Sequence, residues 1–146
     1  MSARAARHCW ILVAEDDNDD QRLLLDAFQQ CGLDCRLEFH GDGESLLQAL
    51  DLRDVSDAPH LILLDLNMPR MDGRETLDRL RADPVLSKVP VVVMSTSAAE
   101  DDASRARRAG CDAYFVKPAE YGALLEMVSL IARRWLLPAH GPGTDR

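Results

Sequence analysis

The chain has 146 residues, which is enough for one folded domain and too few for two of ordinary size. Hydrophobic residues make up 47% and charged residues 29%, so the composition is that of a globular protein and excludes a disordered or low-complexity chain. The 25 acidic residues outnumber the 17 basic ones, and the net charge of -8 argues against a nucleic-acid partner bound through its phosphates.

Five short apolar runs alternate with longer segments of helical periodicity. This alternation predicts an α/β domain in which helices cover both faces of a parallel sheet. The predicted strands are residues 9–14, 35–40, 61–66, 89–94 and 113–116. The first, third and fourth runs are almost entirely apolar and should be central strands, whereas the second alternates polar and apolar residues and suits an edge.

Apolar side chains at helical spacing predict helices between the strands. The first three stripes consist of Leu23, Leu24, Ala27 and Phe28; of Leu46, Leu47 and Leu50; and of Thr76, Leu77 and Leu80. Gly32 is expected to cap the first helix at its C-terminus, and Pro84 to close the third. The fourth helix, near residues 100–109, is weakly apolar and should be the least firmly packed element.

The last helix is predicted over residues 121–137. Its sheet-facing stripe should consist of Leu124, Leu125, Val128, Ile131 and Trp135. Met127, Leu130 and Leu137 then lie on a neighbouring face that the sheet does not cover, which suits either a subunit contact or a tail folded back over it. Residues 138–146 are expected to form a flexible tail, so the predicted domain spans residues 1–137.

The four cysteines are Cys9, Cys31, Cys35 and Cys111. They form no C-x-x-C pair and lie among apolar neighbours, so we expect reduced, mostly buried thiols and no zinc site. The apolar run at residues 9–14 is too short for a secretory signal, and no run approaches the ~20 residues that span a bilayer. We therefore expect a cytoplasmic protein with no membrane partner.

Polar residues lie at or directly after the ends of four of the predicted strands, at the edge of an open parallel sheet where ligands bind. These residues are Glu15, Asp16 and Asp17; Asp65 and Asn67; Ser95 and Thr96; and Lys117 and Pro118. Clustered carboxylates repel one another, and a hard cation removes that conflict. Oxygen ligands favour Mg²⁺, with Asp16 and Asp65 as direct ligands, the backbone carbonyl of Asn67 as a third, and Glu15 reaching through water.

With Mg²⁺ and Lys117 nearby, the Asp65 carboxylate could attack a phosphorus atom and become an aspartyl phosphate. The ammonium group and the metal would stabilise the equatorial oxygens during transfer, and the Ser95 hydroxyl could donate to a phosphoryl oxygen afterwards. The chain contains neither of two glycine-rich nucleotide-binding motifs, G-x-x-x-x-G-K-[ST] and G-x-G-x-x-G. The phosphoryl donor is therefore expected to be another molecule.

Four motifs in this order resemble the receiver domain of two-component response regulators, from about residue 10 to residue 135. They are LVAEDD, LLDLNMPRMDG around Asp65, VVVMSTS around Ser95, and YFVKP around Lys117. The resemblance implies a flavodoxin-like, doubly wound sheet of five parallel strands in the order 2-1-3-4-5. It also implies Mg²⁺ as cofactor and a sensor histidine kinase as partner.

The resemblance assigns a role to each site residue. Asp65 is the phosphoacceptor, Glu15 and Asp16 the metal-binding acids, Ser95 the switch hydroxyl, Tyr114 the switch aromatic, and Lys117 the site lysine, joined to Pro118 by a cis peptide. Family members more often carry threonine at the Ser95 position and two aspartates at the acidic pair. Whether Asp16 or Asp17 contacts the metal stays open, with Asp16 favoured because it keeps register with the strand end.

The output expected from the resemblance is a phosphorylation-dependent change of the face made by helix 100–109, strand 113–116 and the last helix. Because no output domain follows, we expect a stand-alone regulator. The loop at residues 53–59 and the long last helix are similar to small regulators that partner phytochrome-type kinases and can dimerise. Two alternatives are an adaptor that is never phosphorylated and an aspartyl-phosphate hydrolase, which needs an aspartate where Asn67 stands.

Overall fold

The computed structural model describes residues 9–54, 57–67 and 73–137. The strands are β1 (Cys9–Ala14), β2 (Cys35–His40), β3 (Leu61–Asp65), β4 (Val91–Ser95) and β5 (Ala113–Val116). The helices are α2 (Asn18–Gln30), α3 (Gly43–Asp51), α4 (Gly73–Ala82), α5 (Glu100–Ala109) and α6 (Tyr121–Ile131), with short helical turns η1 (Leu86–Lys88) and η2 (Ala132–Leu136).

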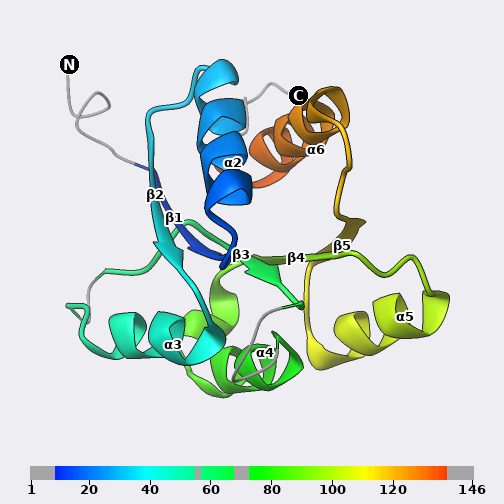
Figure 1. The fold of residues 1–146 in the computed structure, drawn as a ribbon. Helices are drawn as coiled ribbons and strands as arrows, with labels where there is room; N and C mark the ends of the chain where they lie inside the picture. The colour runs from blue at the N-terminus through cyan, green and yellow to red at the C-terminus, as the bar shows by residue number, and fades with distance from the viewer. Residues whose placement is uncertain (1–8, 55–56, 68–72, 138–146) are drawn as a thin grey trace, which may run out of the picture.

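The five strands form one parallel sheet in the order β2-β1-β3-β4-β5. Helices α2 and α6 cover one face of this sheet, and α3, α4 and α5 cover the other (Figure 1). The doubly wound α/β fold and its predicted strand order are therefore confirmed, with β2 at an edge.

Three strands have the predicted bounds, and two differ. β3 ends at Asp65, one residue early, and β4 begins at Val91 instead of residue 89. The delay in β4 follows from η1, because the Val89 N–H is already bonded to the Leu86 carbonyl, at 3.0 Å, and Pro90 has no N–H to offer a neighbouring strand. The shift extends β4 to Ser95.

The core has two halves, because successive side chains of each strand point to opposite faces of the sheet. The half between the sheet and helices α2 and α6 includes Ile11, Val13, Phe28, Leu63, Met94 and Val128. The half between the sheet and helices α3 and α4 includes Leu12, Leu46, Leu64, Leu77, Leu80 and Val93. Every residue of β3 and β4 is buried, which explains why these segments are apolar without alternation.

Most helix predictions hold, with differences on α2 and α3. Leu24, Ala27 and Phe28 are buried, but Leu23 is exposed, and Leu47 of α3 is only partly buried. Gly32 follows α2 with a φ of 76°, as expected for a helix C-cap. Helix α5 buries only two alanines, in agreement with the expectation that it is the least firmly packed helix.

The last helix is oriented differently from the prediction. Its buried residues are Leu124, Met127, Val128 and Ile131. Met127 is only 4% exposed and belongs to the core, so its predicted place on the uncovered face is wrong. These four positions have i, i+3, i+4, i+7 spacing, and this stripe packs inward beside α2. Leu130 and Leu137 are 51% and 43% exposed, as expected, whereas Leu125 and Trp135 are partly buried.

The side chain of Arg81 joins the end of α4 to two other elements. Its Nε donates to the Gly110 carbonyl at 2.8 Å, and its other nitrogens reach the carbonyls of Ser87 and Val89 and the carboxylate of Asp112, each at 3.0 Å. Gly110 is the left-handed C-cap of α5. The C-terminal end of α5 is thereby fixed to α4 and to the start of β5.

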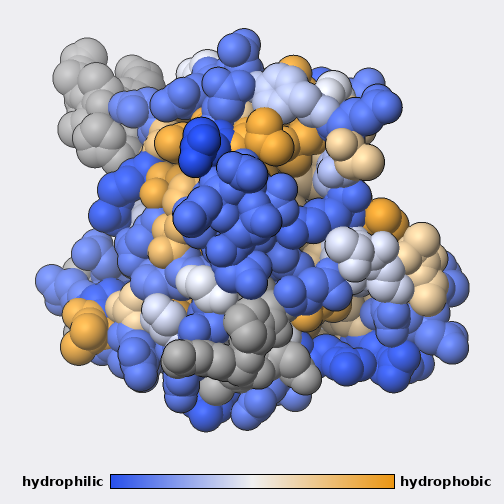
Figure 2. Space-filling model, viewed as in Figure 1, coloured by the Kyte–Doolittle hydropathy of each residue, from blue (hydrophilic) through white to orange (hydrophobic). Residues whose placement is uncertain are grey.

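The surface is mainly polar. In the view of Figure 2, hydrophilic residues cover most of the molecule and hydrophobic ones are seen in separate small areas. All four cysteines are free and partly exposed, so the expectation of mostly buried thiols is wrong. Within the described ranges no helix has the length and hydropathy to cross a bilayer. The predicted tail at residues 138–146 lies outside these ranges.

Candidate functional site

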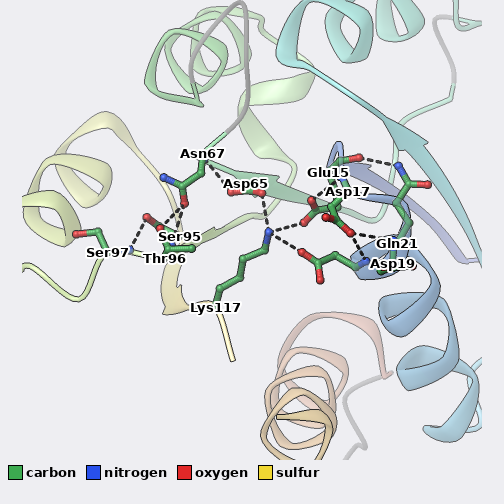
Figure 3. Close-up of polar contacts among 11 residues, drawn as sticks. Glu15, Asp17, Asp19, Gln21, Asp65, Asn67, Ser95, Thr96, Ser97 and Lys117 are labelled. Carbon is green, nitrogen blue, oxygen red and sulfur yellow. Dashed lines mark hydrogen bonds and ion pairs between the residues drawn. The ribbon is translucent and has the colours of Figure 1, made fainter. Parts of the chain in front are cut away.

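Three strand ends bring the central residues of the site together. Glu15 directly follows β1, Asp65 ends β3, and Lys117 directly follows β5 (Figure 3). Backbone hydrogen bonds continue the sheet up to these positions, from Glu15 N–H to the His40 carbonyl at 2.8 Å and from Lys117 N–H to the Ser95 carbonyl at 2.7 Å. The parallel sheet therefore fixes where these side chains begin.

The ammonium group of Lys117 links three carboxylates. Its Nζ lies 2.8 Å from Glu15 Oε1, 2.9 Å from Asp65 Oδ2 and 3.1 Å from Asp20 Oδ2. Glu15 is 0% exposed and Asp65 1% exposed, so the ammonium group neutralises two buried acids.

Burial and charge act in opposite directions on these groups. Burial favours the neutral form of Lys117, but its hydrogen bonds to Glu15 and Asp65 outweigh burial and hold its pKa well above the usual range. Burial raises the pKa of Glu15, and the hydrogen bond from Lys117 opposes that rise. Lys117 is therefore a permanent cation at the centre of the site.

Asp65 and Asn67 are connected to the loop that follows β4. The second carboxylate oxygen of Asp65, Oδ1, accepts a hydrogen bond from the Asn67 N–H at 2.8 Å. The side-chain oxygen of Asn67 accepts from the Thr96 N–H at 2.8 Å and from the Thr96 hydroxyl at 3.2 Å. Asn67 thus ties the loops after β3 and β4 together beside the carboxylate.

The acidic residues after β1 divide into different roles. Asp17 is the N-cap of α2, and its carboxylate accepts from the N–H groups of Asp19 and Asp20 at 2.9 and 3.0 Å. Glu15 is held by the Asp17 N–H at 3.1 Å on its side chain and by Gln21 at 2.7 Å on its carbonyl. Asp17 therefore stabilises the helix, whereas Glu15 points into the site.

Two of the acids that contact Lys117, together with Asp16, could also hold a cation. The carboxylates of Glu15, Asp16 and Asp65 each offer an oxygen, and these three oxygens lie within 4.8 Å of one another. Such a set of hard oxygen donors fits a divalent cation of the Mg²⁺ or Mn²⁺ type. Two of the acids are buried and Asp16 is exposed, so a bound ion would keep a side open to water.

Ser95 and Tyr114 meet through Ser97. The buried Ser95 hydroxyl accepts from the Ser97 N–H at 3.1 Å, and the Tyr114 hydroxyl donates to the Ser97 carbonyl at 2.8 Å. The Ser97 hydroxyl donates to Asp102 in the first turn of α5 at 2.5 Å. A cavity of about 140 Å³, lined by Asn67, Ser95, Ser97 and Asp102 among others, lies between these loops.

One feature of the predicted site is wrong. Every peptide bond in the described residues is trans, including the bond between Lys117 and Pro118. The trans form of a bond preceding proline is favoured by about 0.5–1 kcal/mol, and the Lys117 side chain reaches its partners without the cis form.

Sequence reasoning missed three residues of this arrangement. Asp20 pairs with Lys117, Gln21 holds the Glu15 carbonyl, and Ser97 joins Ser95 to Tyr114 and Asp102. For Asp20 the run of acids after β1 was a signal, although such a run is also typical of a helix N-terminus. For Gln21 and Ser97 the sequence carries no comparable signal.

Residues 11–129 match the family model of the response regulator receiver domain. The chain belongs to this family. The identification also confirms the predicted placement in two-component signalling.

Known regulatory proteins are similar to this chain. The probable methanogenesis regulatory protein FilR2 of Methanothrix harundinacea is 35% identical over 135 residues, covering 91% of this chain and 87% of FilR2. Response regulator Rcp1 of Synechocystis is 36% identical over 129 residues, covering 86% of this chain and 88% of Rcp1.

Solved structures of response regulators are also similar to this chain. A crystal structure of the phosphorylated cyanobacterial phytochrome response regulator RcpA has a TM-score of 0.83 and 34% identity, covering 93% of this chain and 99% of RcpA. The Mn²⁺-bound form of Rcp1 has a TM-score of 0.79 and 34% identity, covering 92% of this chain and 99% of that one.

Proposed function

We propose that this receiver accepts a phosphoryl group on Asp65 from the phosphohistidine of a sensor kinase. The single observation that carries the proposal is the ion pair of Lys117 with both Glu15 and Asp65, at 2.8 and 2.9 Å, on strand ends that only the fold brings together. A structural role alone would not require two buried acids and a partly buried cation at the open edge of a sheet.

The transfer depends on Mg²⁺ in this proposal. Glu15, Asp16 and Asp65, with the backbone carbonyl of Asn67, would hold the ion, and the Mn²⁺-bound form of Rcp1 supports a divalent cation in this family. Asp16 is preferred to Asp17 because the Asp17 carboxylate caps α2. The bound ion would supply positive charge against the phosphoryl oxygens and lower the repulsion between the acids.

The residues of the chain divide the chemistry between them. A carboxylate oxygen of Asp65 attacks phosphorus, the bond between phosphorus and the histidine nitrogen breaks, and the imidazole leaves with its electron pair. The Lys117 ammonium group stabilises charge on the transferred oxygens. Water later attacks the aspartyl phosphate and returns Asp65 with release of inorganic phosphate, so the protein limits the lifetime of its own signal.

The new charge of about -1.5 to -2 then acts on Ser95. We infer that the Ser95 hydroxyl turns to donate to a phosphoryl oxygen and gives up its bond from the Ser97 N–H. Because Ser97 also contacts Tyr114 and Asp102, the loop after β4 rearranges together with α5. The changed surface is the face made by α5, β5 and α6. If the helices are numbered so that the first one after β1 is α1, the same face is α4-β5-α5.

The partner is a histidine kinase, and a phytochrome-type kinase is the specific proposal. It is supported by the likeness to RcpA, which is a phytochrome response regulator. A second copy of the chain is the other proposed partner, bound through the same face of α5, β5 and α6. Leu130 and Leu137 supply its exposed apolar side chains, while Met127 is buried in the core.

The test is phosphorylation of the purified chain with acetyl phosphate, followed by intact-mass measurement. We expect a gain of one phosphoryl group that needs Mg²⁺ and is lost in Asp65→Asn. Asp17→Asn is the matched control, since it removes a neighbouring carboxylate that caps α2, and it should still be phosphorylated. The cognate kinase is then sought by incubating candidate kinases and labelled ATP with the chain.

Other results would contradict the proposal. Phosphorylation that persists in Asp65→Asn would exclude Asp65 as acceptor. Sustained turnover of phosphate esters would favour the hydrolase alternative, and no phosphorylation by any donor would favour an adaptor that is never phosphorylated.

A further inference from the structure

Cys9 and Cys35 face each other across two neighbouring strands. They are the first residues of β1 and β2 and are direct partners in the parallel register. Neighbouring strands lie about 4.8 Å apart, within the roughly 4.4–6.8 Å that separates the Cα atoms of a disulfide. Both side chains pack against the same half of the core, so they point to the same face of the sheet.

The two thiols also differ in chemical character. A hydrogen bond from Cys35 lowers the pKa of Cys9, although burial opposes the change, and the same bond together with burial raises the pKa of Cys35. Cys9 is therefore the better nucleophile and Cys35 the proton donor beside it. Both side chains are partly exposed, so a small oxidant can reach them.

We propose that Cys9 and Cys35 form a reversible dithiol–disulfide pair that is oxidised by peroxides. With hydrogen peroxide, the Cys9 thiolate attacks one oxygen, the O–O bond breaks and Cys9 becomes a sulfenic acid, while the departing hydroxide takes the proton of the Cys35 thiol and leaves as water. The Cys35 thiolate then attacks the sulfenic sulfur, the S–O bond breaks as the S–S bond forms, and the departing hydroxide takes a proton from the solvent to leave as a second water molecule. A dithiol reductant reverses the change by taking up the two oxidising equivalents.

The position of the pair keeps its oxidation separate from phosphorylation. Cys9 and Cys35 begin their strands, whereas Asp65 ends β3, and parallel strands place these positions at opposite edges of the sheet. The disulfide would close the loop formed by β1 and α2 and would fix the edge strand β2 to the central strand β1. Oxidation should therefore raise thermal stability and leave Asp65 able to accept a phosphoryl group.

The other two cysteines serve as internal controls. Cys31 packs on the same half of the core but lies at the end of α2, outside any strand register. Cys111 packs against the opposite half of the core, and burial raises its pKa. Proximity to the core alone would therefore not single out Cys9 and Cys35.

The experiment treats the reduced full chain with one equivalent of hydrogen peroxide, followed by alkylation and intact-mass measurement. Two of the four thiols should escape alkylation, and a dithiol reductant should restore them. The melting temperature of the oxidised chain should rise by roughly 10 °C. Cys9→Ser and Cys35→Ser should each abolish both effects, whereas Cys31→Ser and Cys111→Ser should keep them.

The bond is assigned in the Cys31→Ser variant, because Cys31 and Cys35 lie on one tryptic peptide between Arg22 and Arg36. A peptide linked to Cys9 in that variant supports the pair. A bond between two chains, a bond to Cys31 or Cys111, or four thiols that all remain open to alkylation would overturn it. These measurements use the unmodified chain as well, so a variant that fails to fold does not decide the outcome.

Discussion

The Ser97 hydroxyl donates a 2.5 Å hydrogen bond to the Asp102 carboxylate, so the loop after β4 is tied to the first turn of α5. The same serine bonds Ser95 through its N–H and Tyr114 through its carbonyl. One residue therefore contacts the proposed phosphate-sensing hydroxyl, the proposed switch aromatic and the helix whose movement we propose as output. This arrangement gives α5 a direct link to the site.

The first prediction concerns the pH dependence of this link. The hydrogen bond from Ser97, and then the charge of Arg105, lower the pKa of Asp102. An acid whose pKa is lower in the folded than in the unfolded protein stabilises the fold at pH values above its unfolded pKa. This stabilisation is lost as the pH falls through the folded pKa. Ser97→Ala should therefore lower the melting temperature at pH 7, and the difference from the wild type should shrink in acid. Melting curves measured from neutral to acid pH check this.

Asp102→Asn provides the control for the first prediction. In that background, adding Ser97→Ala should have an effect that no longer varies with pH. A carboxyl titration by nuclear magnetic resonance that gives Asp102 the same pKa with and without Ser97 would contradict the assignment.

The second prediction concerns the countercharge in the site. Lys117→Gln leaves the buried acids Glu15 and Asp65 without their cation, which should cost about 3 kcal/mol of unfolding free energy. Added Mg²⁺ should recover more stability in this variant than in the wild type, because it neutralises the same carboxylates. Urea unfolding with and without MgCl₂ measures both effects.

Lys88→Gln is the matched control, since Lys88 is the other lysine of the chain and is exposed. Its unfolding free energy should stay close to that of the wild type. Equal losses in the two variants would mean that net charge, and not the ion pairs, explains the effect.

The third prediction compares one substitution at two glycines. A Cβ at Gly73 would lie 3.0 Å from the Leu66 Cα and closer still to the Leu66 side chain, next to Asp65. Gly73→Ala should therefore destabilise the fold by about 1–3 kcal/mol. Gly122 lies in α6 with no atom within 4 Å of its added Cβ, so Gly122→Ala should stabilise by about 0.5–1 kcal/mol. Opposite signs in chemical unfolding support the packing explanation, and equal signs oppose it.

The fourth prediction concerns Tyr121, whose hydroxyl donates to the Asp26 carboxylate. This bond raises the pKa of Tyr121 to about 12. Its stabilisation is therefore present below pH ~10, the ordinary tyrosine pKa, and is lost as the pH rises through the folded value. In Tyr114→Phe, which leaves Tyr121 as the only tyrosine, tyrosinate absorbance should develop late in an alkaline titration. Adding Asp26→Asn should move that transition back toward the ordinary value.

The strands were the most predictable part of the fold, because a buried parallel strand has an apolar run of its own. Residues 9–14, 35–40 and 113–116 were predicted with the observed bounds. The start of β4 was not, since the backbone hydrogen bond of the turn η1 that occupies the Val89 N–H has no mark in the sequence, although Pro90, which lacks an N–H, was a signal for a later start. Strand ends in turn predicted which acids, hydroxyls and lysine lie at one edge.

Orientation within α6 was harder to predict, because this helix is apolar on more than one side. Two stripes fit its sequence, and packing beside α2 selects the one that contains Met127. The hydrogen bonds and ion pairs of the site were likewise not predictable from the sequence. Asp17 and Asp20 have the same side chain, yet one caps α2 and the other pairs with Lys117, because their places on the first turn differ.

Arg81 sets the way in which α5 can move. Its guanidinium fastens the Gly110 end of the helix, while the opposite end is connected to the site only through Ser97 and Asp102 among the bonds described above. A rearrangement that starts at Ser95 would then tilt α5 about a fixed hinge at Gly110. The largest displacement would fall at the N-terminal end of the helix. A partner that binds this end would therefore respond most strongly to phosphorylation of Asp65.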